Sequence, residues 1–301
     1  MSLLVTGSIG IDTVEAPTGK VENVLGGSSI YCAYAASFFS PVRLVGVVGE
    51  DCPDGFLRPL EDNPRIDMRG LEVRRGSKTF RWHGRYHRDV NERDTVAVEL
   101  NVLAEGGAAI PPAFRDSRYV FLANTHPALQ LELLGQLAAP ALVVADTMDL
   151  WINNERQALA KLMGRIDGLV LNDSEAKLMA GEANVVAAGL AIGAKVRRFV
   201  VVKKGEHGCL LFADGEVFAM PSYPAFRVID PTGAGDTFAG AMMGYLADQA
   251  RTDLPTLRRA LAYGTVTASI ELEDFSLNKL LQTRREDIDE RMGQFERLTR
   301  F

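Results

Sequence analysis

Cysteine is scarce in this chain, and its three copies, Cys32, Cys52 and Cys209, lie far apart in the 301 residues. An odd number of cysteines without C-x-x-C spacing excludes a disulfide framework and a cysteine-based zinc site. Free thiols of this kind are typical of proteins in a reducing compartment. We therefore expect a cytoplasmic protein.

Long apolar runs and strong positive charge are missing as well. No apolar run reaches the roughly 18 residues that a membrane-spanning helix needs, and residues 1–7 lack the basic segment of a signal peptide. The formal net charge of −6 disfavours nucleic acid and anionic membranes as partners. We therefore expect a soluble protein that acts on small molecules.

Short apolar runs alternate with helical patterns along most of the chain, and the last third is mostly helical. The expected strands are 3–5, 44–48, 119–123, 142–145, 169–171 and 199–202. The expected helices are 28–39, 127–138, 155–164, 174–180, 236–248, 254–272 and 277–299. Continuous buried runs such as 141–145 are typical of parallel strands covered on both faces. The pattern predicts a single α/β domain over residues 1–301, with three α/β/α layers and a mostly parallel central sheet.

Residues 78–88 break this pattern because they alternate with period two. Aromatic side chains point to one face and basic side chains to the other: Phe80, Trp82 and Tyr86 against Arg81, His83, Arg85 and His87. Such a strand lies outside a buried parallel sheet. With residues 13–25 and other parts of 72–104, notably 72–75 and 95–100, it could form a small antiparallel β lid. An edge hairpin packed on the domain is the alternative.

The segment 230–240, DPTGAGDTFAG, places a glycine-rich turn directly before a predicted helix. The free amides of Gly233, Ala234 and Gly235 at the helix start would bind an anion, and glycine lets a phosphate approach the backbone closely. A carboxylate at Asp236, beside such a site, is suited to removing a proton from a group that attacks the phosphate. The segment predicts phosphoryl transfer; a glycine turn with an aspartate cap is the alternative.

The common nucleotide motifs G-x-x-x-x-G-K-[ST] and G-x-G-x-x-G are absent. The segment 230–240 instead resembles the second signature of the ribokinase-like (PfkB-type) carbohydrate kinases, and the order of elements is similar over nearly the whole chain. The resemblance implies a ribokinase-like fold and the use of ATP and Mg²⁺. It implies that Asp236 is the catalytic base, that residues 233–235 form the anion hole and that Thr232 contacts nucleotide. Asp230 resembles a position that in some members helps to hold a monovalent cation such as K⁺.

Two further segments resemble the nucleotide side of these kinases. Asn172 and Glu175 resemble the N-x-x-E motif, which positions Mg²⁺, often through water; the same spacing is a capping box, and both interpretations can hold together. Lys203, Gly205 and Gly208 resemble the strand and turn that approach the phosphates and ribose. An exposed hairpin turn is the alternative for this second segment.

Asp12 and the glycine pair Gly26 and Gly27 resemble the residues that bind the acceptor in this family. The resemblance implies that Asp12 binds substrate hydroxyls. Tyr31 stands where sugar kinases usually carry asparagine, which puts ribose itself in doubt and favours a flatter or differently hydroxylated acceptor. Other residues that could reach the acceptor are Asn124, Thr125, His126, Asp146, Asp149 and, by stacking, Trp151.

The combined prediction is an ATP- and Mg²⁺-dependent kinase that phosphorylates a hydroxyl of a small carbohydrate. A nucleoside kinase of the same family is the first alternative. The basic face of residues 78–88 leaves open a sugar-phosphate kinase, although a solvated face is the simpler interpretation, and a non-catalytic sugar-binding sensor is a further alternative. The aromatic face of the expected lid could also form a homodimer.

Overall fold

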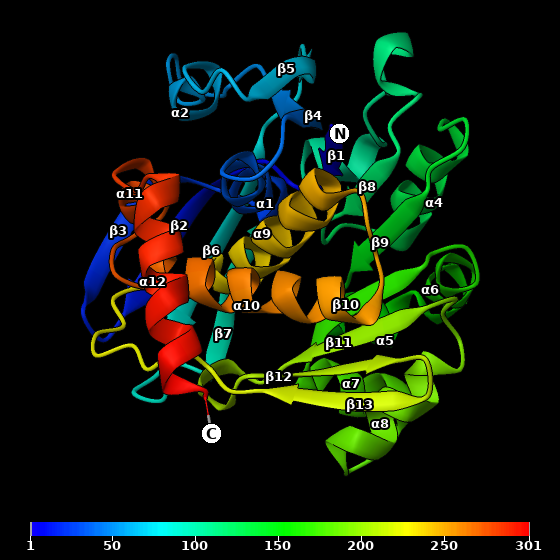
Figure 1. The fold of residues 1–301 in the computed structure, drawn as a ribbon. Coiled ribbons are helices and arrows are strands. Elements are labelled where there is room, and N and C mark those ends of the chain that lie inside the picture. Colours follow the sequence, from blue (N-terminus) through cyan, green and yellow to red (C-terminus); the bar gives the residue numbers. More distant parts are fainter. Residues whose placement is uncertain (1, 301) are drawn as a thin grey trace.

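The computed structural model describes residues 2–300, in which a large sheet and a small sheet are separate (Figure 1). The large sheet has the strand order β13-β12-β11-β10-β9-β8-β1-β4-β5. Every pair from β11 to β5 is parallel, whereas β12 and β13 extend one edge antiparallel. The strands are β1 (Leu3–Thr6), β4 (Val42–Gly49), β5 (Ile66–Arg74), β8 (Tyr119–Leu122), β9 (Leu142–Asp146), β10 (Gly168–Asn172), β11 (Phe199–Lys203), β12 (Cys209–Ala213) and β13 (Glu216–Met220).

Helices cover both faces of the large sheet, which confirms the three-layer α/β/α prediction (Figure 1). One face carries α1 (Ser28–Ser37), α9 (Ala234–Gln249), α10 (Leu254–Glu271), α11 (Asn278–Leu281) and α12 (Arg285–Leu298). The other face carries α4 (Pro127–Gly135), α5 (Asp149–Asn154), α6 (Arg156–Met163), α7 (Asp173–Ala180) and α8 (Val185–Gly193). The remaining helical turns are α2 (Arg58–Glu61), α3 (Val102–Glu105), η1 (Pro112–Phe114) and η2 (Gly205–His207).

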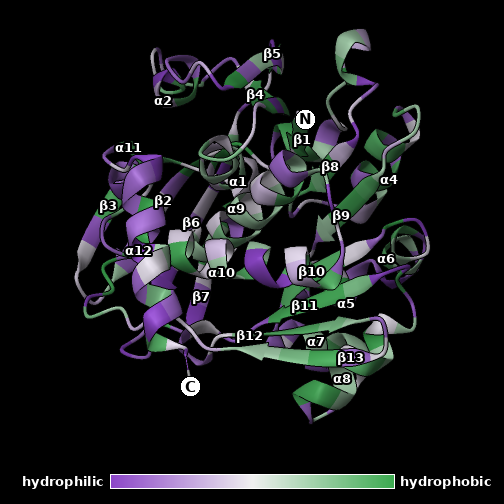
Figure 2. Ribbon diagram, viewed as in Figure 1, coloured by the Kyte–Doolittle hydropathy of each residue, from purple (hydrophilic) through white to green (hydrophobic). Residues whose placement is uncertain are grey.

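Neighbouring residues of each central strand enter different cores. In β1, Leu3 and Val5 pack beneath α1 and α9, whereas Leu4 packs into the core on the opposite face. The central strands are accordingly mainly hydrophobic, while much of α12 is hydrophilic (Figure 2). Both faces being buried explains why the strands appeared in the sequence as continuous apolar runs.

The predicted helix 277–299 is wrong as a single element, because α11 ends at Leu281 and α12 begins at Arg285. Arg284 is extended, and its backbone N–H donates to the Asp287 carboxylate at 2.7 Å. This capping contact starts a new helix and stabilises the break.

The small sheet has the order β3-β2-β6-β7, with β2 (Gly10–Ala16), β3 (Gly19–Gly26), β6 (Phe80–Tyr86) and β7 (Arg93–Glu99). Its presence confirms the predicted second sheet. Two details of the prediction are wrong. The pair β2–β6 is parallel, and residues 72–75 do not join this sheet: residues up to Arg74 continue the parallel ladder of β5 with β4, and the chain turns away only at Gly76, where φ is +75°.

The four side chains of the basic face predicted within residues 78–88 are paired with carboxylates of the protein itself. The pairs are Arg81–Asp51 at 3.0 Å, His83–Glu15 at 3.1 Å, Arg85–Glu15 at 2.6 Å and His87–Asp94 at 2.9 Å. The face is partly solvated, as expected, but its charges are paired, so it offers little unpaired charge to an anionic acceptor.

The crossing of α1 and α9 fixes the place where α9 begins. An added Cβ on Gly240 would collide with the carbonyl oxygen of Cys32, and one on Gly244 would lie 2.6 Å from that of Ala36. Only glycine allows this approach of the two helix backbones, so this packing positions the glycine turn at the start of α9.

We predict that Gly244→Ala destabilises the fold by about 1–3 kcal/mol, because overpacking outweighs the gain in helix propensity. Urea unfolding measures the change. Gly293→Ala is the matched control, since a Cβ there, inside α12, would meet only Arg297 Nη1 at 3.8 Å. This control should be neutral or stabilising by up to about 1 kcal/mol. Equal stability of the two variants would contradict the packing argument.

Candidate active site

The first turn of α9 is shaped as an anion-binding turn. Gly233 caps the helix in the left-handed region, with φ +86°. Its Cα faces the Tyr31 ring, which leaves no space for a Cβ. Within the described residues, the amides of Gly233 and Gly235 have no hydrogen-bond partner, whereas that of Ala234 lies 3.3 Å from the Pro231 carbonyl oxygen. Free amides at the positive end of a long helix suit a phosphate oxygen.

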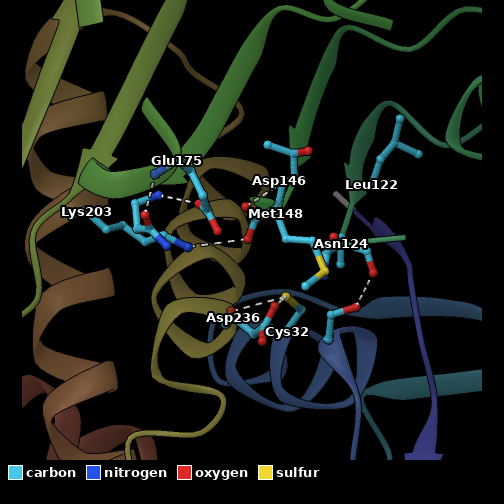
Figure 3. A network of polar contacts seen from close by, with 12 residues as sticks. Cys32, Leu122, Asn124, Asp146, Met148, Glu175, Lys203 and Asp236 are labelled. Carbon is cyan, nitrogen blue, oxygen red and sulfur yellow. Dashed lines mark hydrogen bonds and ion pairs between the residues drawn. The ribbon is translucent and has the colours of Figure 1, made fainter. Parts of the chain in front are cut away.

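Asp236 lies in this first turn and is partly exposed. Burial raises the pKa of its carboxyl to about 8, and the negative charge of Asp146 adds to this rise, while Lys203 and Arg93 oppose it. The Cys32 thiol donates to the Asp236 backbone carbonyl at 3.1 Å (Figure 3). A carboxyl with a pKa in this range can take a proton from an alcohol more readily than an ordinary aspartate.

Lys203 ends β11 and directs its ammonium toward the same turn (Figure 3). Its Nζ lies 3.4 Å from Asp146 Oδ2, and a Cβ on Gly235 would lie 2.9 Å from Nζ. Burial lowers the pKa of Lys203, but the charges of Asp146, Glu175 and Asp236 more than offset this, so its pKa is raised. The turn therefore combines backbone amides with a permanent positive charge.

Asn172 and Glu175 form the predicted capping box at the start of α7. The Asn172 amide donates to Glu175 Oε2 at 2.7 Å, and the Glu175 amide donates to Asn172 Oδ1 at 2.8 Å. The Glu175 carboxyl also lies near Lys203 and Asp146 (Figure 3). Burial, with the charge of Asp146, raises its pKa to about 7. Glu175 therefore caps α7 and also lies inside the candidate site.

These carboxylates fit a magnesium ion that is held mainly by phosphate and water. Asp146, Glu175 and Asp236 surround the single ammonium of Lys203, and Mg²⁺ prefers oxygen ligands. Across residues 2–300, no cluster of three His, Cys, Asp or Glu side chains is arranged to hold a metal by itself. That Glu175 acts on the ion through water, which the resemblance implies, stays a prediction.

The turn after β11 contains Gly205 and Gly208, both with positive φ. A Cβ on Gly208 would collide with the Met220 carbonyl oxygen, so the approach of β13 already requires this glycine. Gly205 is exposed to solvent, and its Cα faces the Asn91 side chain of the small sheet. Their contact with nucleotide stays a prediction.

Thr232 and Asp230 lie just before the anion-binding turn. The Thr232 amide donates to Asp230 Oδ1 at 2.8 Å, and its hydroxyl donates to the Tyr86 hydroxyl at 3.3 Å. Asp230 is fully buried, and its second oxygen accepts the Ser276 amide at 3.3 Å. Burial raises the pKa of Asp230.

Asp12 and the glycine pair lie together, as the resemblance implied. A Cβ on Gly26 would overlap the Asp12 carboxyl, and Gly27, with φ +98°, would meet the Ser8 carbonyl oxygen. Burial raises the pKa of Asp12 to about 7, although a hydrogen bond from the Gly27 backbone opposes this. Asp12 Oδ1 has no partner within the described chain, and a buried unpaired oxygen is suited to a substrate hydroxyl.

Tyr31 lies beneath the anion-binding turn. It is 2% exposed, and its ring packs against Gly233. Burial raises the pKa of its hydroxyl well above the ordinary value, and the charges of Asp230 and Glu271 contribute to this rise. An open stacking surface for a flat acceptor is not found at Tyr31, so its clearest role is to support the turn.

Trp151, a candidate for stacking on the acceptor, is held by residues that follow β8. Its indole N–H donates to Asn124 Oδ1 at 3.0 Å, and its ring lies 5.0 Å from that of His126. The Asn124 side-chain amide lies 3.1 Å from Met148 Sδ (Figure 3). These contacts connect the loops after β8 and β9 beside the site.

Sequence reasoning did not assign the positions that three charged residues of this region occupy in the structure. Asp146 was expected on the acceptor side, but it pairs with Lys203; its place at the end of a buried strand was a usable signal. Glu271 is fully buried in α10, and neither carboxylate oxygen has a partner within residues 2–300. Arg93 begins β7, and its charge reaches Asp236. No local motif marks Glu271 or Arg93.

The sequence profile of the pfkB family of carbohydrate kinases matches residues 2–284. The chain belongs to this family. A cytidine kinase of Thermococcus kodakarensis is 29% identical over 257 residues, which are 83% of this chain and 89% of the relative. The pfkB membership also establishes that this protein is a phosphotransferase, a kinase of the sugar and nucleoside class.

Solved structures show the same fold at lower identity. A Burkholderia thailandensis nucleoside kinase in complex with inosine has a TM-score of 0.78 at 19% identity, covering 99% of this chain and 98% of that one. An Escherichia coli protein in complex with ATP and Mg²⁺ has a TM-score of 0.76 at 18% identity, covering 97% and 99%. The ribokinase-like fold is thereby confirmed. Among residues 2–300 there is no helix long and apolar enough to cross a membrane.

We predict that Asp236→Asn stabilises the fold, and more so at pH 9 than at pH 5. The folded protein holds a proton on Asp236 up to a pKa of about 8, above the ordinary value of 3.8. The stability that this proton contributes is present below 3.8 and is lost as the pH rises through about 8. Asparagine removes the pH-dependent cost.

Thermal melts at both pH values test this prediction. Asp214→Asn, in the exposed turn between β12 and β13, is the control and should shift Tm equally at both pH values. A Tm difference between wild type and Asp236→Asn that does not grow with pH would count against the buried ionisation.

Proposed function

We propose that this protein is an ATP- and Mg²⁺-dependent kinase that phosphorylates a hydroxyl of a small uncharged carbohydrate. The supporting observation is the convergence, at one helix end, of the free amides of Gly233 and Gly235, the Asp236 carboxyl and the Lys203 ammonium. A base, an anion-binding turn and a cation are the groups that phosphoryl transfer requires. In this proposal the large sheet and the small sheet form one kinase domain with a lid.

In the proposed reaction, the acceptor hydroxyl loses its proton to Asp236 while its oxygen attacks the γ-phosphorus of ATP. The bond between the γ-phosphorus and the β,γ-bridging oxygen breaks, and ADP leaves. Lys203 and the amides of the turn stabilise the negative charge on the transferred group. Bound Mg²⁺ would neutralise phosphate charge, with Glu175 orienting its water ligands.

The acceptor side favours a neutral polyol. The unpaired Asp12 oxygen can accept a hydrogen bond from a sugar hydroxyl, whereas the basic side chains of β6 and of His87 after it are already paired with Glu15, Asp51 and Asp94. This pairing disfavours a sugar phosphate. A nucleoside is the second candidate, because the cytidine kinase relative matches most of the chain and a nucleoside also presents sugar hydroxyls.

Three further features belong to the proposal. Buried Asp230 and the unpartnered oxygens of Glu271 fit a nearby monovalent cation such as K⁺. Replacing K⁺ by tetramethylammonium in activity assays would test this.

The exposed edge strand β7 suits a homodimer formed through the lid. Sedimentation at several protein concentrations would test this. Three free cysteines suit the cytoplasm.

An ADP-release screen across sugars, polyols, nucleosides and sugar phosphates tests the proposal and names the acceptor. Phosphate transfer to a sugar or nucleoside would support it. No transfer to any acceptor, together with tight acceptor binding in a thermal-shift assay, would favour a non-catalytic sensor instead.

With the acceptor in hand, Asp236→Asn should lower kcat by about 10³-fold, within the usual range for loss of a general base. Nucleotide binding, measured by calorimetry, should be retained because the anion-binding turn is intact. Asp214→Asn is the control for carboxylate loss away from the site. Full activity of Asp236→Asn would refute the role of Asp236 as base.

The pH dependence of kcat/KM should report the same group. Asp236 accepts a proton only when ionised, and its pKa is about 8. We therefore expect kcat/KM to fall about tenfold per pH unit below this value. A flat profile between pH 6 and 8 would mean that proton removal by Asp236 does not limit the reaction.

A further inference from the structure

The hairpin tip, residues 87–92, connects β6 to β7 of the small sheet. Within the tip, the Glu92 amide donates to the Asp89 carbonyl at 2.9 Å. The Asn91 backbone and side-chain amides donate to Asp89 Oδ1 at 2.9 and 3.0 Å. These bonds hold Asn91 in a defined position, and the ladder with Tyr86 positions Arg93, the first residue of β7, although both residues are exposed.

The tip contacts the turn after β11 at its exposed end. The Asn91 carboxamide oxygen lies directly over Gly205, so that any Cβ there would collide with it. Asp89 lies close enough to His207 for their charges to interact. The same turn follows Lys203, whose ammonium reaches the start of α9.

A second set of contacts joins the lid to the anion-binding turn. Tyr86 pairs with Arg93 across the hairpin, and its hydroxyl accepts the Thr232 hydroxyl at 3.3 Å. The Arg93 guanidinium lies over the Trp82 ring, 5.4 Å from its centre, and its charge reaches Asp236. Side chains of the small sheet and its hairpin thus contact Gly205 and Thr232, and the charge of Arg93 reaches Asp236.

The site contains more acidic than basic side chains, so another cation would be stabilised there. Asp146, Glu175 and Asp236 face the single ammonium of Lys203, and bound ATP would add several negative charges. Arg93 brings a guanidinium, which binds phosphate oxygens in a forked geometry that lysine lacks. It comes from β7 of the small sheet, whereas Lys203 comes from β11 of the large sheet.

We propose that Asn91 and Arg93 form an outer binding site for the phosphate chain of a nucleoside triphosphate, so that the lid closes on the nucleotide as well as on the acceptor. Asn91 holds the tip at the Gly205 end of the phosphate path, and Arg93 contacts the terminal phosphate beside Asp236. This inference rests on the proposed use of ATP. Its consequence is that bound nucleotide and bound acceptor favour the same closed lid.

Calorimetry with the β,γ-imido analogue of ATP and Mg²⁺ tests the inference. We expect Arg93→Met to weaken binding of the analogue about 10- to 100-fold, the range for losing a charge-assisted hydrogen bond. Arg93→Lys should recover part of the loss, and Asn91→Ala should weaken binding less. Arg88→Met removes a positive charge beside the tip, where the described chain offers it no partner, and should stay within about twofold of wild type.

A pH profile separates this role from a purely structural one. Because the charge of Arg93 lowers the pKa of Asp236, Arg93→Met should move the acid limb of kcat to higher pH, and Arg93→Lys should restore it. Analogue binding and a pH profile like those of wild type in both Arg93→Met and Asn91→Ala would overturn the inference alone. A wild-type protein that neither binds the analogue nor transfers phosphate would overturn the proposed function together with it.

Discussion

The active site depends on one electrostatic arrangement: three acidic side chains gathered around the Lys203 ammonium at the positive end of α9. Each carboxyl has a raised pKa because the protein surrounds it. Lys203 is held in place by the same charges that it partly neutralises. The sheet brings these groups together. Asp146 ends β9 and Lys203 ends β11, and Glu175 follows β10, the strand between them.

The parallel sheet could be predicted because strands buried on both faces have continuous apolar sequences. The anion-binding turn and Asp236 could be predicted because glycines directly before a helix have a local physical meaning. The glycine pair at Gly26 and Gly27 was assigned from the resemblance to the family, and the structure adds a physical cause: Asp12 and Ser8 fill the space that a Cβ would need. A feature could therefore be predicted from the sequence wherever a single segment contained all the residues that define it.

Features that depend on distant segments could not be predicted in this way. Residues 72–75 resembled lid strands, but the β4–β5 ladder determines their place. The basic residues of β6 looked unpaired because Glu15 and Asp51 lie far away in sequence. Glu271 lies in an ordinary helical pattern, and only the folded chain brings it near Asp230. Tyr31 suggested a flat acceptor surface, but its ring supports Gly233.

The small sheet is built from two separate excursions of the chain, and the parallel β2–β6 ladder joins them. One excursion carries Asp12, and the other carries the hairpin tip. In the proposed function the first excursion contacts the acceptor, so substitutions there would change which acceptor is recognised without altering the second. Acceptor recognition would then be free to diversify while the proposed chemistry at α9 stays constant, because the two halves of the small sheet are encoded far apart and meet along a single pair of strands.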